Sequence, residues 1–142
     1  MRIKQLLIGM TASVIAVSSY VEMAIADLKF PMLVYRTGAY APNGIPNADG
    51  FVDYYKMINA RDGGIGGEKI FHPECETGYK TQVGVECYEK NKKDAMVFQP
   101  MSTGITYQLI PKATADGVSI YSTGYGRTSA ANGKVFKWVF NA

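Results

Sequence analysis

The chain has 142 residues, a formal net charge of +3, and a hydrophobic fraction of 47%. This length corresponds to a single small domain and excludes a multidomain enzyme. The nearly balanced charge argues neither for nor against a polyanion partner, but the lack of basic runs interleaved with aromatic residues argues against nucleic acid.

Residues 1–26 have the three-part form of a secretory signal peptide. Arg2 and Lys4 form a basic start, residues 6–17 are apolar, and residues 24–26 are a small-x-small cleavage site. The apolar part is too short for an anchored membrane-spanning helix. We therefore expect export to the periplasm and a mature domain of residues 27–142.

Beyond residue 27 the apolar pattern alternates between strand and helix periodicity. Strands are expected at residues 28–35, 68–74, 95–98 and 118–121, with a candidate fifth strand at residues 135–140. Helices are expected at residues 45–58 and 79–92, and from Ser102 to Gly117 with a kink at Pro111. This β-α-β-α-β-α-β order predicts an α/β fold, a parallel sheet with helices on both faces.

Parallel sheets bind ligands beyond the carboxyl ends of their strands, where the strand order reverses. The loops expected there are rich in Gly, Ser, Thr and Tyr: residues 37–44, 100–104 and 122–128. Ser102 and Thr103 open a helix, whose free N–H groups and positive dipole end suit a carboxylate or phosphate. The alternative is an ordinary N-cap that binds nothing. Tyr40 and Tyr125 either stack on a ligand or pack within their loops.

His72, Cys75 and Cys87 form a second group of chemically active residues. In an oxidising compartment the cysteine pair is a candidate disulfide, and a metal site of all three residues is the alternative. The chain has no second histidine and no nucleophile elbow, so we expect neither an enzyme nor a cofactor. The glycine run at residues 63–67 follows a helix, which indicates a connection rather than a dinucleotide fingerprint.

Six short segments follow one another with specific spacing: Thr37-Gly38-Ala39-Tyr40-Ala41, Ala48-Asp49-Gly50-Phe51, Ile58-Asn59-Ala60, Gly63-Gly64-Ile65, Ser102-Thr103-Gly104 and Ser122-Thr123-Gly124-Tyr125-Gly126. Together with the exported start, they resemble type I periplasmic solute-binding proteins, in particular the branched-chain amino acid and amide group that serves ABC importers. The resemblance covers residues 28–142. It implies part of the amino-terminal lobe of a two-lobed receptor, which binds a small molecule, contacts a membrane permease and needs no cofactor.

The resemblance also implies individual ligand-binding residues. The loop after the third strand would hold the ligand's carboxylate, and the loop after the fourth strand would meet its ammonium or amide end. The corresponding residues are Ser102 and Thr103, then Gly124, Tyr125 and Thr128. An aromatic residue often stands in the first loop, at the position of Asn43, with Tyr40 nearby as a substitute.

Members of this family continue well beyond the length of this chain. The sequence therefore predicts a fragment of the amino-terminal lobe, and weak or absent ligand binding by the chain alone. The alternatives are a non-functional remnant of such a receptor and an exported metal or redox protein built on His72, Cys75 and Cys87.

Overall fold

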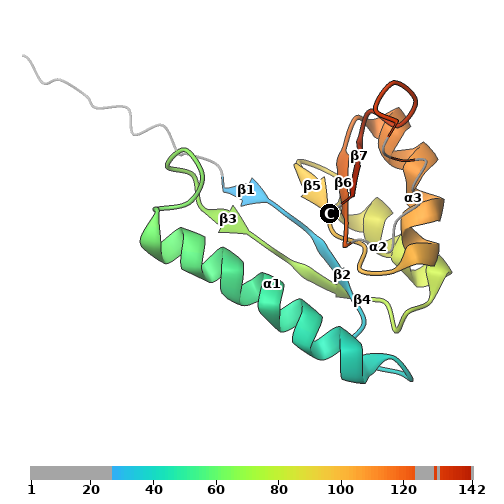
Figure 1. Cartoon of the computed structure of the whole chain (residues 1–142), viewed down its shortest axis with the longest axis horizontal. Helices are drawn as coiled ribbons and strands as arrows, with labels where there is room; N and C mark the ends of the chain where they lie inside the picture. Colours follow the sequence, from blue (N-terminus) through green and yellow to red (C-terminus); the bar gives the residue numbers. More distant parts are fainter. Residues whose placement is uncertain (1–26, 124–129, 131, 142) are drawn as a thin grey trace, which may run out of the picture.

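The computed structural model describes residues 27–123, 130 and 132–141 (Figure 1). In chain order its elements are β1 Leu28–Lys29, β2 Met32–Val34, α1 Ala41–Arg61, β3 Ile70–Phe71, β4 Glu74–Glu76, α2 Thr81–Asn91, β5 Val97–Phe98, α3 Thr103–Asp116, β6 Ser119–Ser122 and β7 Val139–Asn141. Within these described ranges, no helix is both long and apolar enough to cross a membrane.

Each of the first two predicted strands is divided in two near a proline. Pro31 separates β1 from β2, and Pro73 separates β3 from β4. Proline has no N–H for the ladder, but its carbonyl still accepts. Gln99 donates to the carbonyl of Pro31 and Met32 donates to that of Pro73, so each pair continues as one extended segment.

All paired strands are parallel, as the sequence predicts. β1 pairs with β3 and β2 with β4, while β5, β6 and β7 form a second group. Bridges from Lys29 to Ala95 and from Met32 to Gln99 connect the groups. The lateral order is therefore β3/β4, β1/β2, β5, β6, β7, and the direction of winding reverses between β1/β2 and β5. This reversal is the switch point of a doubly wound sheet.

The two faces of the sheet carry separate hydrophobic clusters. Along β2, Met32 and Val34 pack with Ala48 and Tyr55 of α1, whereas Leu33 points to the opposite face. There it joins a cluster with α2 and α3 that includes Tyr88, Phe98, Ile105, Leu109 and Ile120. Figure 1 shows α1 along one side of the sheet and α2 with α3 on the other. The predicted covering of both faces is confirmed.

Two predicted boundaries are each wrong by four residues. The first helix begins at Ala41 rather than at residue 45, because Pro42 falls in the first turn, where a helix N–H has no partner anyway. The last strand begins at Val139 rather than near residue 135, because Val135 and Phe136 both donate to the carbonyl of Asn132 in turns. Helix α3 runs through Pro111, and the kink there stays a prediction.

Candidate functional site

The loops after β2, β4 and β5 come together at the carboxyl edge of the sheet. Strand β2 is paired with β4 on one side and bridged to the end of β5 on the other. A Cβ atom on Gly38 would lie 3.5 Å from the carbonyl oxygen of Gly78, and one on Gly104 would lie 3.0 Å from Thr81 Oγ1. The three loops therefore form one continuous edge at the switch point.

Ser102 is the N-cap of α3. Its backbone is extended, its Oγ accepts from Ile105 N at 3.5 Å, and its carbonyl accepts from both N and Oγ1 of Thr106. Only 4% of Ser102 is exposed, whereas Thr103 is half-buried. The first turn of α3 has no acidic residue, so its positive dipole end is not compensated there. The capping role is present, and the role of both residues toward a ligand stays a prediction.

Tyr40 lies in the first loop and is 54% exposed. Its ring centroid is 4.5 Å from that of Tyr79, which also contacts the ring of Tyr35 at 4.8 Å. Tyr79 has φ of 63°, which is rare for a bulky residue. The loops after β2 and β4 thus share an aromatic cluster with one exposed member.

The sequence predicted Asn43 in the first loop, and the structure shows that it lies elsewhere. It is in the first turn of α1 and is exposed, because the helix begins earlier than its apolar periodicity indicated. Gly44, the next residue, packs directly against Tyr35, since a Cβ atom there would lie 2.0 Å from the Tyr35 carbonyl oxygen. Tyr40 is therefore the aromatic residue that this loop presents.

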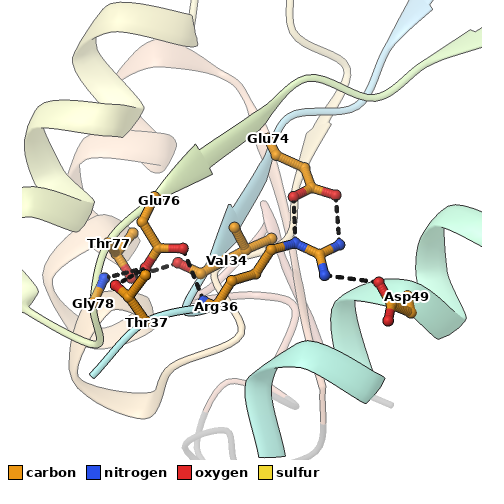
Figure 2. Close-up of polar contacts among 8 residues, drawn as sticks. All are labelled: Val34, Arg36, Thr37, Asp49, Glu74, Glu76, Thr77 and Gly78. Carbon is orange, nitrogen blue, oxygen red and sulfur yellow. Dashed lines mark hydrogen bonds and ion pairs between the residues drawn. The ribbon is translucent and has the colours of Figure 1, made fainter. Parts of the chain in front are cut away.

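Glu76, at the end of β4, holds the first two loops together (Figure 2). Its Oε2 accepts from Arg36 N at 2.8 Å, and its Oε1 accepts from Thr37 Oγ1 at 3.1 Å and from Gly78 N at 2.7 Å. Burial opposes the charge of Glu76, but the donors from Arg36, Gly78 and Thr37 outweigh it, and the pKa of Glu76 is lowered.

Arg36 connects the same edge to helix α1. Its Nε and Nη2 donate to the two oxygens of Glu74 at 2.6 and 2.8 Å, and its Nη1 donates to Asp49 at 2.7 Å (Figure 2). The carboxylate of Glu74, followed by that of Asp49, raises the pKa of Arg36. A bidentate guanidinium–carboxylate pair fixes geometry as well as charge. Helix α1 is thereby tied to β4 through Asp49.

The sequence reasoning missed Arg36, Glu76 and Tyr79. A signal for the first two was present, because Glu74 ends one predicted strand with Glu76 two residues later, and Arg36 directly follows the predicted strand at residues 28–35. The position of Tyr79 depends on a left-handed backbone conformation, which could not be predicted from the sequence.

Cys75 and Cys87 are joined in a disulfide that ties β4 to α2, with their Cα atoms 5.9 Å apart. Both sulfurs are used in this bond, so they cannot serve as thiolate ligands. Within residues 27–123, 130 and 132–141, His, Cys, Asp and Glu form no group of three placed to hold a metal. The disulfide therefore removes two of the three ligands that the metal alternative requires. Gly124, Tyr125 and Thr128, predicted in the loop after β6, lie outside the described residues.

The family model described as "Periplasmic binding protein" matches residues 27–142. The chain belongs to the periplasmic binding protein family. No curated protein sequence matches it. Among solved structures, a protein described as an ABC transporter permease from the Pseudomonas fluorescens group is 39% identical, with a TM-score of 0.75, covering 80% of this chain and 29% of that one.

Two more distant structures share the periplasmic binding protein fold. One is LivJ of Streptococcus pneumoniae, a branched-chain amino acid transporter substrate-binding protein in complex with isoleucine. It is 20% identical, with a TM-score of 0.69, and the match covers 82% of this chain and 33% of LivJ. The other is a solute-binding protein of Rhodopseudomonas palustris in complex with benzoate. It is also 20% identical, with a TM-score of 0.65, and the match covers 82% of this chain and 32% of that protein. The chain spans about a third of the length of these family members.

Proposed function

We propose that this chain forms the first part of the amino-terminal lobe of a solute receptor that delivers a small molecule to an ABC importer outside the cytoplasm. The observation that carries the proposal is the convergence of three loops at the switch point of a periplasmic-binding-protein sheet. The role is reversible capture, without covalent chemistry. The export signal in residues 1–26 is part of the proposal.

The proposed ligand carries a carboxylate. Isoleucine and benzoate, the ligands of two similar structures, share only that polar group. Ser102 and Thr103 carry hydroxyl groups at the positive end of α3, whose first turn holds no acidic residue, and this favours an anion. Tyr40 would contact the body of the ligand. Branched-chain amino acids and related amides are the first candidates because of the resemblance in sequence.

The loop after β6 would complete this half of the site. Gly124 and Tyr125, with Thr128, would contact the ligand's ammonium or amide end. In two-lobed receptors, closure of the second lobe over the ligand provides much of the affinity. We therefore expect the isolated chain to bind weakly or not at all.

Isothermal titration tests the proposal on two proteins. One is the chain itself, and the other is a chimera in which residues 27–142 replace the matching segment of the 39%-identical Pseudomonas protein. The titrants are leucine, isoleucine, valine, benzoate, urea and short amides. We expect micromolar binding of at least one of the carboxylate titrants by the chimera only, and binding of urea or a short amide without binding of any carboxylate contradicts the proposed anion. Micromolar binding by the chain alone contradicts the need for a second lobe, and no binding by a folded chimera contradicts the proposed ligand class.

A further inference from the structure

Two Asn-Gly pairs occur in the chain, Asn43-Gly44 and Asn132-Gly133. A backbone nitrogen attacks the side-chain amide of the preceding asparagine most easily when it belongs to glycine, because glycine has no Cβ to crowd it. Both asparagines are exposed, so access of water does not distinguish them. Their backbones do differ, since one pair lies in the first turn of α1 and the other in the turn before β7 (Figure 1).

The Asn132 side chain is folded back over the peptide that follows it. Its Oδ1 accepts a hydrogen bond from Lys134 N at 3.2 Å, which is the contact of an Asx turn. The Gly133 nitrogen lies between these two groups in the chain, so the turn brings it toward the side-chain amide carbon. The Lys134 N–H also meets the oxygen on which negative charge develops when that carbon is attacked, as a donor in an oxyanion hole does. Position and electrostatics therefore both favour closure of a ring by the Gly133 nitrogen.

The surroundings of Gly133 leave room for this reaction. Among the described residues, the Gly133 N–H donates no hydrogen bond, and a Cβ atom there would meet nothing within 4 Å. The carbonyl of Asn132 accepts from Val135 N at 3.0 Å and from Phe136 N at 2.9 Å. These bonds hold the Asn132–Gly133 peptide, which contains the attacking nitrogen, in one orientation beside the side chain.

The surroundings of Gly44 oppose the same reaction. Its N–H donates to the carbonyl of Tyr40 at 3.0 Å, within the first turn of α1. Gly44 is also buried, and a Cβ atom there would lie 2.0 Å from the carbonyl oxygen of Tyr35. To reach the Asn43 side chain, the Gly44 nitrogen would have to break its hydrogen bond and leave this contact. Asn43 is therefore protected by the helix although its side chain is exposed.

We propose that Asn132 is a site of spontaneous self-modification, at which the chain converts this asparagine to aspartate and isoaspartate, and that helix α1 prevents the same reaction at Asn43. The Gly133 nitrogen bonds to Asn132 Cγ, the Cγ–Nδ2 bond breaks, and the proton lost by Gly133 passes through water to the nitrogen that leaves as ammonia. Water then opens the cyclic imide at one of its two carbonyl carbons. Attack at Cγ gives aspartate, and attack at the main-chain carbonyl carbon gives isoaspartate.

Isoaspartate alters the turn more than aspartate does. Both products carry a carboxylate in place of a neutral amide. In isoaspartate the main chain also runs through Cγ, and the former main-chain carbonyl becomes the free carboxylate. That carbonyl is the acceptor for Val135 N and Phe136 N, so the turn that leads into β7 loses its peptide acceptor. Because β7 pairs with β6, the change reaches the end of the sheet.

Peptide mapping by mass spectrometry tests this reaction without any ligand, so its outcome is independent of the proposed function. The purified chain is incubated in neutral buffer, and the loss of each asparagine is followed with time. Asn43 is the matched control within the same molecule, since it also precedes glycine. A parallel sample in guanidinium chloride gives the rates of both pairs without the fold.

In the folded chain, Asn43 should react at least about tenfold more slowly than Asn132, because it reacts only through local opening of the helix start. In guanidinium chloride the two rates should converge. Equal rates in the folded chain overturn the proposal. So does an Asn132 that stays unmodified in the folded chain although it reacts in the unfolded one.

Gly133→Ala tests the attacking nitrogen. The new Cβ meets nothing within 4 Å, so the Tm should be retained, but the methyl group crowds the nitrogen, and most of the modification at Asn132 should be lost. The rate at Asn43 should not change. Modification of Asn132 at an unchanged rate would contradict ring closure by this nitrogen.

Thermal unfolding separates the two products. The fraction that contains isoaspartate should have a Tm about 4 °C below that of Asn132→Asp, the shift expected for the loss of one backbone hydrogen bond. The Asn132→Asp variant carries the same added charge with a normal main chain. Equal Tm values would contradict the predicted loss of the turn's acceptor.

Discussion

Gly84 on α2 lies directly against Ile105 on α3. A Cβ atom at residue 84 would lie 2.6 to 2.7 Å from three carbon atoms of the Ile105 side chain. Both residues are fully buried, and the two helices share the cluster that fills this face of the sheet. The absence of a side chain at residue 84 therefore sets how closely α2 and α3 approach.

Gly84→Ala should destabilise the chain by about 1–2 kcal/mol, because overpacking outweighs the gain of up to 1 kcal/mol in helix propensity. The matched control is Gly50→Ala, also inside a helix but with nothing within 4 Å of the new Cβ. It should stabilise by about 0.5–1 kcal/mol. Urea unfolding measures both, and a Gly84→Ala variant as stable as Gly50→Ala would contradict the packing argument.

Arg36→Ala should reduce stability by about 1 kcal/mol. The loss is larger than for a typical surface pair because Arg36 binds Glu74 through two atoms and Asp49 through a third, with 28% of its side chain exposed. Arg61→Ala is the control and should change little, since the partner of Arg61 within the described part of the chain is its exposed neighbour Asp62. Equal midpoints in urea for the two variants would show that the Arg36 contacts do not stabilise the fold.

Glu76→Gln should destabilise the chain at neutral pH and have less effect in acid. The folded-state pKa of Glu76 is lowered, so its charge contributes stability above the ordinary value of 4.5, and this is lost as the pH falls through the folded-state pKa. The expected loss at pH 7 is about 0.5–1 kcal/mol, since an amide cannot accept all three hydrogen bonds. Unfolding from pH 7 to pH 3 checks this, with Glu86→Gln as an exposed control. A difference independent of pH would contradict the assignment.

The disulfide can be tested by mass and by stability. Reduction should raise the mass by two hydrogen atoms and lower stability by about 2–3 kcal/mol, because the bond closes a short loop between β4 and α2. Cys75→Ala with Cys87→Ala should have a similar effect without reductant. A mass unchanged by reductant would show that the two cysteines are not bonded.

The sheet was predictable because its signals are local. Short apolar runs around residues 32–34 and 119–122 alternate with helical periodicity, and that order restricts the topology to a parallel α/β sheet. Ser102 was recognised at a helix start for the same reason. The start of α1 was missed, because Pro42 in a first turn resembles a loop signal. The contacts of Glu76 could not be predicted, because they depend on the register between β2 and β4. Those of Tyr79 depend on its left-handed backbone conformation, which the sequence does not specify.

Two substitutions of Thr103 test whether the start of α3 is only a helix cap or also binds a ligand carboxylate. Thr103→Asp and Thr103→Asn give side chains of equal size that differ in charge. Aspartate in the first turn of α3, which has no acidic residue, should stabilise the helix relative to asparagine by about 0.3–1 kcal/mol.

If a ligand carboxylate binds at this helix start, the same charge should repel it. The chimera with Thr103→Asp should then be the more stable of the two and yet bind carboxylates at least about tenfold more weakly than the Thr103→Asn chimera, a factor that corresponds to 1.4 kcal/mol. Unfolding and titration on the same samples distinguish the cases: equal affinities would mean that α3 begins with a cap alone, and that the anion is held elsewhere.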